Sequence, residues 1–275
     1  MPIITPDQAV VESVKANALA HVDRLSESVG RVLSKRPKNR AVHSASGIFI
    51  SYKGEEYFLT AAHPFVDKGT DDLLLVGTRR KAISIREATH SYSKDASITD
   101  DVLDVGVLRI SQHMRNEIGP THPIAIDHMI SHHLYEVGRN FMIVGYPRSK
   151  NKRPIQSDLP TTNRSVFISG LRESQVIGAH GSVRAQTHIV IGWSDNTANL
   201  QGEKIVAHSA LGMSGAPIFD LGDYSDFGVL AGTDRPTPLL AGVFTRHGVQ
   251  DKALIGTRLN ALVDVLNRES SWPSH

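Results

Sequence analysis

The chain of 275 residues contains no cysteine. It can therefore form no disulfide bond and no thiolate metal site, and we expect it in a reducing compartment, the cytoplasm. Its formal net charge is only +2 at pH 7, which gives no reason to expect a nucleic-acid partner. No apolar run is long enough to cross a membrane, and the first residues lack the pattern of a signal peptide. We expect no membrane partner either.

The first residues carry a helical pattern. Thr5, Pro6 and Gln8 suit a helix start, because Thr-x-x-Gln forms a capping box and proline is favoured in the first turn. Apolar residues then recur in steps of three and four, which predicts a helix over residues 5–33 with one apolar stripe. The stripe consists of Val11, Val14, Ala18, Val22, Leu25, Val29 and Val32. This helix is either an appendage packed on the protein itself or a docking element for a partner or a second copy.

Residues 34–40 are rich in lysine and arginine. We interpret them as a solvated connector, with a nucleic-acid patch as the alternative. From residue 42 the period of the apolar residues changes to two, and short strands recur between turns, beginning with a hairpin around Lys53-Gly54. No helices alternate with these strands, so the pattern predicts barrels or sandwiches rather than an α/β hydrolase. A short helix near residues 259–266 closes the chain.

The segment Ala210–Pro217 carries the strongest chemical signal. Ser214 lies between Gly212 and Gly215, a composition that suits a tight turn with an exposed hydroxyl and outward-facing N–H groups. Gly-x-Ser-Gly alone also occurs in ordinary loops. Two upstream segments make the signal specific, Thr60-Ala61-Ala62-His63 and Asp104-Val105-Gly106-Val107-Leu108. Histidine, aspartate, serine is one of the known chain orders of the serine-hydrolase triad.

Together these three blocks resemble the trypsin-like, chymotrypsin-fold serine endopeptidases, and most closely the disulfide-free bacterial and intracellular members. The resemblance covers residues 42–268. It implies an all-β fold of two six-stranded antiparallel barrels, with an N-terminal helix and a short C-terminal helix added. It divides the chain into the helix and connector (1–41), the first barrel and linker (42–138, with the barrel boundary in 111–138) and the second barrel (139–275).

The resemblance also implies the chemistry. Ser214 is expected to attack a polypeptide substrate and form an acyl-enzyme, with His63 as the base and Asp104 orienting it. The backbone N–H groups of Gly212 and Ser214 are expected to bind the oxyanion, and no cofactor or metal is implied. Asp100 and Asp101 compete with Asp104, but only Asp104 directly precedes a strand.

Two positions depart from the digestive relatives. Met213 stands where many of them carry an aspartate that pairs with a newly cut N-terminus, so we do not expect that activation device. His208 falls near the floor of the specificity pocket, where trypsin has an aspartate, so a preference for arginine or lysine is not expected. Other residues expected to bind substrate are Ser209, Thr245, Arg246 and His247.

Other functions and clusters remain open. The fold could serve as a binding or sensor module with little turnover, or as an intracellular protease gated by a partner that binds the N-terminal helix. A second basic run is either a solvated loop near the site or a contact for acidic substrate: Arg148, Lys150, Lys152 and Arg153. The histidines His122, His132 and His133 lack the spacing of metal ligands.

Overall fold

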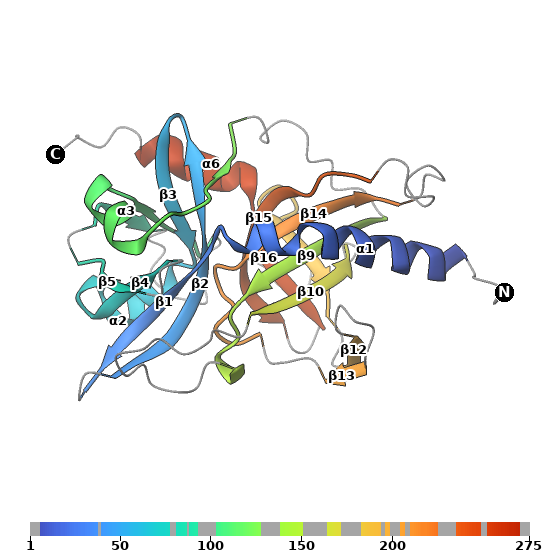
Figure 1. Ribbon diagram of the computed structural model, residues 1–275, viewed down its shortest axis with the longest axis horizontal. Coiled ribbons are helices and arrows are strands. Elements are labelled where there is room, and N and C mark those ends of the chain that lie inside the picture. The colour runs from blue at the N-terminus through green and yellow to red at the C-terminus, as the bar shows by residue number, and fades with distance from the viewer. Residues whose placement is uncertain are drawn as a thin grey trace.

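Two curled sheets of mainly antiparallel strands form the body of the protein. The structure is a computed structural model that describes residues 6–37, 40–77, 81–86, 88–92, 103–127, 138–150, 164–171, 183–193, 196–198, 204–206, 210–224, 235–248 and 252–269. Figure 1 shows the first sheet on the left and the second on the right, with a long helix lying across the second. The predicted all-β fold of two barrels is therefore confirmed.

The first sheet has eight strands. They are β1 (Val29–Arg36), β2 (Arg40–Tyr52), β3 (Glu55–Thr60), β4 (Leu73–Val76), β5 (Ala82–Ser84), β6 (His90–Tyr92), β7 (Gly106–Arg109) and β8 (Ile124–Ala125). Their order is β5-β4-β1-β2-β3-β7-β6, with β8 paired to β2. The predicted hairpin joins β2 to β3, and both of its turn residues, Lys53 and Gly54, have positive φ angles of 50° and 79°. Such angles match the right-handed twist of the flanking strands.

The second sheet has six strands, in the order β10-β9-β14-β15-β16-β11. They are β9 (Arg139–Gly145), β10 (Ser165–Gly170), β11 (His188–Gly192), β14 (Pro217–Asp223), β15 (Leu239–Gly248) and β16 (Ala253–Arg258). A bridge between Leu171 and Ile191 brings its two edge strands together. A separate hairpin is formed by β12 (Asn196–Ala198) and β13 (Lys204–Val206).

Helices decorate the two sheets. They are α1 (Pro6–Ser26), α2 (His63–Lys68), α3 (Gln112–Ile118), α6 (Leu259–Glu269) and the short 3₁₀ turns η1 (Thr70–Asp72) and η2 (Arg148–Lys150). The predicted C-terminal helix is α6. The unpredicted α3 lies where the linker between the barrels was expected, and the hydroxyl of its N-cap Ser111 accepts from the Met114 N–H at 3.2 Å. None of the helices in the described segments is both long and apolar enough to cross a membrane.

The predicted helix over residues 5–33 is wrong in its last quarter, residues 27–33. Helix α1 ends at Ser26, and Val29 and Val32 belong to β1, which pairs with both β2 and β4. The spacing of three residues between Val29 and Val32 does not by itself distinguish a helix from a strand. Gly30, between them, disfavours the helix. In the strand, Gly30 leaves room for aromatic rings: a methyl group there would come 2.7 Å from a Phe58 ring carbon.

The basic connector over residues 34–40 is corrected for the same reason. Ser34 to Arg36 continue β1, and Arg40 begins β2. The first barrel therefore begins at Val29, inside the segment 1–41 that was assigned to the helix and connector. The capping residue Thr5 lies outside the described residues.

Helix α1 packs against the protein's own second sheet, at β9 and β14. Four stripe residues are buried in a core that both barrels and α6 share: Val14, Ala18, Val22 and Leu25. Val11 is half exposed and does not belong to this contact. Among the buried residues Asn17 is polar, and its Nδ2 donates to Tyr224 Oη at 2.6 Å and to the carbonyl oxygen of Pro236 at 3.0 Å. The helix is thus fixed by apolar burial and by one amide.

We predict that Asn17→Ala lowers the free energy of unfolding by about 1–3 kcal/mol, because it leaves buried acceptors without a donor. The measurement is chemical denaturation of the full-length protein. Val11→Ala, on the half-exposed side of the same helix, is the control and should change stability by less than about 0.5 kcal/mol. Equal losses in the two variants would show that the amide does not anchor α1.

Candidate active site

Pairing of β3 with β7 brings His63 next to Asp104. In this ladder Thr60 lies opposite Gly106, so the residues just beyond the end of β3 meet those just before β7. His63 opens α2, and Asp104 comes two residues before β7. Gly106 permits the close approach, because a methyl group there would come 2.6 Å from a ring carbon of Phe65 in α2. Two residues far apart in the sequence thus share one corner of the first barrel.

The Asp104 carboxylate makes contacts in two directions. Its Oδ2 lies 3.0 Å from His63 Nδ1. Its Oδ1 accepts from the backbone N–H groups of Ala62 and His63, each at 2.9 Å, and so satisfies free amides at the start of α2. Asp104 has a φ of 45°, a left-handed conformation that aspartate tolerates better than most residues. The backbone geometry and the hydrogen bonds therefore fix this carboxylate toward the imidazole.

The environment of His63 raises its pKa above the ordinary value of 6.5. Burial by itself disfavours the imidazolium, but the hydrogen bond and the charge of Asp104, helped by Asp67, outweigh it. A carboxylate beside Nδ1 also keeps a proton on that nitrogen, so Nε2 carries the lone pair in the neutral ring. The neutral ring of His63 can therefore accept a proton at Nε2.

The second barrel places Ser214 on a turn between Ala210 and β14. The carbonyl oxygen of Ser214 accepts from the N–H of Ser46 in β2 at 2.9 Å. Gly215, with φ 84°, lies so close to the first barrel that a methyl group there would come 2.2 Å from the Ser46 carbonyl oxygen and 2.7 Å from the Ala61 nitrogen. The Ser214 turn therefore lies directly against the strand end that leads to His63.

Carbonyl oxygens of this turn accept hydrogen bonds from the protein, whereas the N–H groups of Gly212 and Ser214 donate none to the described residues. Leu211 O accepts from Arg148 N–H at 2.8 Å, and Met213 O accepts from Ala216 N–H at 2.8 Å. Because N–H and C=O point in opposite directions across a planar peptide, the N–H groups of Gly212 and Ser214 face away from these anchors. Within the segments that the structure describes, neither N–H has a hydrogen-bond acceptor. The arrangement suits a developing negative charge.

The Ser214 turn contacts the strand end two residues before His63. Among the described residues no hydrogen bond joins the Ser214 hydroxyl to His63. Such bonds are often long in free enzymes and tighten when substrate binds. The structure therefore shows the contact between carboxylate and imidazole, and it places the serine turn against the strand that leads to His63.

A second histidine, His43, was not singled out from the sequence. It lies in β2, is 3% exposed, and its Nε2 is 2.7 Å from the carbonyl oxygen of Gly212. The hydroxyl of Ser46 donates to the same oxygen at 3.2 Å. The sequence gives little signal for either residue, since β2 also contains Ser44 and Ser51 and a histidine in a strand has many uses. Only the fold reveals that both reach the serine turn.

A third unpredicted contact comes from Thr257 in β16. Its hydroxyl donates to the carbonyl oxygen of Leu103, the residue before Asp104. Thr257 is fully buried. The second barrel therefore helps to hold the loop of the first barrel that carries the carboxylate.

The predicted substrate-binding residues differ in their placement. His208 and Ser209 lie outside the described residues, as do Asp100 and Asp101. The Thr245 hydroxyl is buried and donates to the carbonyl oxygen of Ile255 at 3.1 Å, so it points into the barrel. Arg246 and His247 are partly exposed on β15, and the His247 ring packs on Trp193 with 4.8 Å between centroids. Their roles in binding substrate stay predictions.

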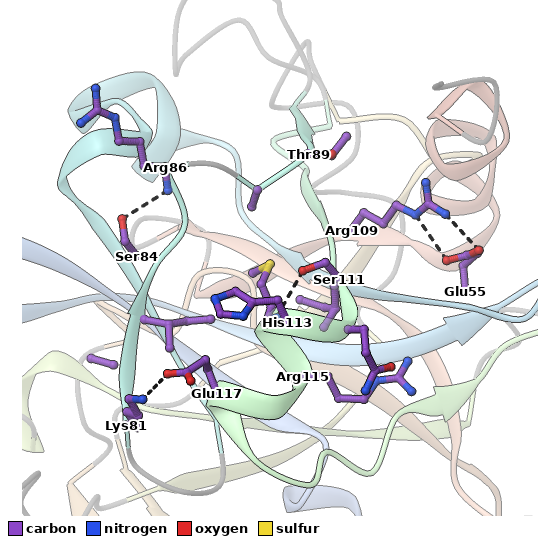
Figure 2. Close-up of a pocket in the computed structure, with 16 residues that line it drawn as sticks. Glu55, Lys81, Ser84, Arg86, Thr89, Arg109, Ser111, His113, Arg115 and Glu117 are labelled. Carbon is purple, nitrogen blue, oxygen red and sulfur yellow. Dashed lines mark hydrogen bonds and ion pairs between the residues drawn. The ribbon is translucent and has the colours of Figure 1, made fainter. Parts of the chain in front are cut away.

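A hollow of about 840 Å³ lies elsewhere on the first barrel, lined by residues of β5, β7 and α3. Figure 2 shows two ion pairs among its side chains, Lys81 with Glu117 and Arg109 with Glu55 at 3.0 Å. Its other two arginines, Arg86 and Arg115, pair with Asp71 and Glu56 beyond the hollow. His63, Asp104 and Ser214 do not line it. Since these charges neutralise each other, the hollow gives no sign of a ligand's chemistry. In the described segments no group of three or more histidine, aspartate or glutamate residues is arranged to hold a metal ion.

The buried His43 makes stability depend on pH. Its pKa is lowered to about 4, first by burial and also by the charges of Arg31 and Arg148, against carbonyl contacts at Gly212 and Tyr146 that raise it. Between pH 6.5 and 4 the unfolded chain therefore binds a proton that the folded protein rejects. We predict that the stabilisation seen above pH 6.5 is lost as the pH falls toward 4, by about 3 kcal/mol at most.

The measurement is the free energy of unfolding at pH 7 and pH 4.5, compared between the wild type and His43→Gln, which cannot take up the proton. Between pH 7 and pH 4.5 the wild type should lose more of its free energy of unfolding than His43→Gln does. His113→Gln, at an exposed histidine of α3, is the control. A pH dependence that His43→Gln leaves unchanged would contradict the assignment.

Comparison with known proteins agrees with this architecture. No protein-family model and no curated protein sequence matches the chain. Among solved structures, the VesB protease of Vibrio cholerae matches 90% of this chain with a TM-score of 0.56 and 12% identity, and the chain spans only 65% of that protein. A structure named HL collagenase matches 90% of this chain and 95% of its own, with a TM-score of 0.54 and 14% identity. The active form of the Rv3671c protease from M. tuberculosis matches 100% and 94%, with a TM-score of 0.50 and 17% identity. The chain therefore has the two-barrel fold of the chymotrypsin-like serine proteases.

Proposed function

We propose that this protein is a serine endopeptidase that hydrolyses peptide bonds through an acyl-enzyme. The observation that carries the proposal is the contact of 3.0 Å between Asp104 Oδ2 and His63 Nδ1. It is joined by a serine turn with two N–H groups that have no acceptor among the described residues. A carboxylate, an imidazole and a hydroxyl in this order form a known nucleophilic device. The fold supports the proposal, since its structural neighbours include proteases.

The reaction begins at the Ser214 hydroxyl. Its oxygen attacks the carbonyl carbon of the scissile peptide while its proton passes to Nε2 of His63. The imidazolium that forms is stabilised by the Asp104 carboxylate, which also fixes the ring's orientation. The same proton is then given to the leaving amine as the C–N bond breaks. Ser214 is left as an ester.

Hydrolysis of the ester repeats these steps with water. Water gives a proton to His63, adds to the acyl carbon, and the Ser214 oxygen leaves with the proton from His63. In both halves a negative charge develops on the carbonyl oxygen. The N–H groups of Gly212 and Ser214 would bind that charge, and one such donor is worth roughly 3 kcal/mol in a related site. The chemistry needs no cofactor.

We predict that Ser214→Ala abolishes peptide hydrolysis and leaves the fold intact, because Ser214 is the nucleophile. Asp104→Asn should lower kcat on the order of 10⁴-fold, the loss typical of an imidazole held in the wrong tautomer. The measurements are turnover of a peptide library and circular dichroism of each variant. Asp101→Asn is the matched control, since it removes a neighbouring carboxylate. If Asp101→Asn were crippling and Asp104→Asn mild, the acid would be misassigned.

We also predict an acidic limb in the dependence of kcat/KM on pH. A protonated imidazole cannot accept the serine proton, and the pKa of His63 is raised. The midpoint of the limb should therefore lie above the ordinary value of about 6.5. In Asp104→Asn the midpoint should move toward lower pH, since the carboxylate causes the rise. A rate that stays flat down to pH 4 would exclude His63 as the base.

A further inference from the structure

We infer that His43 is a positioning residue for oxyanion binding: its Nε2–H holds the Gly212 carbonyl and thereby aims the N–H groups of Gly212 and Ser214 at the reaction centre. This inference rests on the proposed function, since it concerns the same site. It assigns a role in the reaction to a side chain that touches neither substrate nor Ser214.

The first step is the position of the proton on the ring. The Gly212 carbonyl oxygen can only accept a hydrogen bond, so at 2.7 Å the Nε2 of His43 must be the donor. The hydroxyl of Ser46 donates to the same oxygen at 3.2 Å and accepts from the Tyr146 N–H at 2.9 Å. His43 is therefore the closer of two donors that β2 supplies to one carbonyl.

The second step is the geometry of three successive peptides. In the middle peptide, between Gly212 and Met213, the carbonyl faces β2 and the Met213 N–H donates to the Ala210 carbonyl at 2.9 Å. Its two neighbours point their carbonyls the other way and present the free N–H groups. Gly212 has a φ of 88°, which glycine adopts without strain. Rotation of the middle peptide would move both neighbours, so the bond from His43 controls the direction of both N–H groups.

The third step is the fixed state of the ring. The His43 ring is packed edge-on against the Tyr146 ring, with 6.3 Å between centroids. The Arg31 guanidinium lies over the same Tyr146 ring, 5.3 Å from its centroid. His43 is buried, and its pKa is lowered to about 4 by burial and by the charges of Arg31 and Arg148, against the carbonyls of Gly212 and Tyr146. At neutral pH the ring is therefore uncharged. Its single proton stays on the nitrogen that faces Gly212.

Met213 supports the same conformation from the other side. Its side chain is buried in the core of the second barrel with Phe141, Ile143 and Phe244. The turn is thus fixed on one side by the packed Met213 side chain and on the other by the hydrogen bond from His43. The buried residue at position 213 is uncharged.

The test compares two substitutions of His43 in the full-length protein. His43→Gln can place an amide N–H close to the position of Nε2, whereas His43→Phe fills the space without a donor. We expect kcat of His43→Phe to fall on the order of 10²-fold with KM little changed, as when one oxyanion donor is lost. His43→Gln should recover most of kcat. Asn17→Ala is the control for loss of a buried polar group remote from the turn, and its kcat should equal that of the wild type.

The outcomes separate positioning from a structural role. If His43→Phe keeps the wild-type kcat, or if both variants lose kcat equally, the inference is overturned. A crystal structure of His43→Phe gives a readout without turnover: the Gly212 carbonyl should have left β2, and an unchanged turn would overturn the inference. If the wild type hydrolyses no peptide, the proposed function fails while this structural readout still decides on His43.

A measurement on the wild type covers the case in which His43→Phe does not fold. In ¹⁵N-labelled protein, nuclear magnetic resonance should show a slowly exchanging proton on Nε2 of His43 and a neutral ring from pH 5.5 to 8, the range that a pKa of about 4 implies. A proton on Nδ1 instead would mean that the ring cannot donate to Gly212. The inference would then be wrong whatever the variants do.

Discussion

The contact between β2 and the Ser214 turn is the interaction on which the rest of the site depends. His63 and Asp104 belong to the first barrel and Ser214 to the second, so the site exists only where the barrels meet. The Ser46 N–H holds the Ser214 carbonyl at 2.9 Å, and the Thr60 hydroxyl holds the Ser46 carbonyl at 2.6 Å. A methyl group at Gly215 would clash with the Ser46 carbonyl oxygen. The barrels can approach this closely because Gly215 carries no side chain where its backbone meets the first barrel.

The two histidines of this region show how the environment decides what one side chain does. His63 lies beside a carboxylate, which raises its pKa and keeps Nε2 available to accept a proton. Burial, with a smaller contribution from the charges of Arg31 and Arg148, lowers the pKa of His43 to about 4 and keeps its ring neutral. The first can exchange a proton during a reaction cycle. The second is suited to donate one fixed hydrogen bond. The same residue type is thus suited to proton transfer in one position and to holding a backbone carbonyl in the other.

Local features of the sequence indicated many of the strands from β2 onward, because strand period is encoded within a few residues. Short motifs also singled out His63 and Asp104, whose side chains lie 3.0 Å apart. The end of α1 was missed because Val29 and Val32 fit the helical spacing and the strand equally well, and only pairing with β2 and β4 decided between them. His43 was missed for a different reason. Its partner, the Gly212 carbonyl, is 169 residues away and belongs to the backbone. No pattern of side chains in the sequence could therefore predict the contact.

The most direct test of the central claim is reaction of the wild-type protein with a fluorophosphonate, followed by mass spectrometry and a crystal structure of the adduct. The account predicts a single phosphonyl group on Ser214, with its oxygen within hydrogen-bond distance of the N–H groups of Gly212 and Ser214. It also predicts that His63→Ala reacts far more slowly, since the base is gone. No adduct, or an adduct on another residue, would contradict the account and leave the protease fold without the chemistry proposed for it.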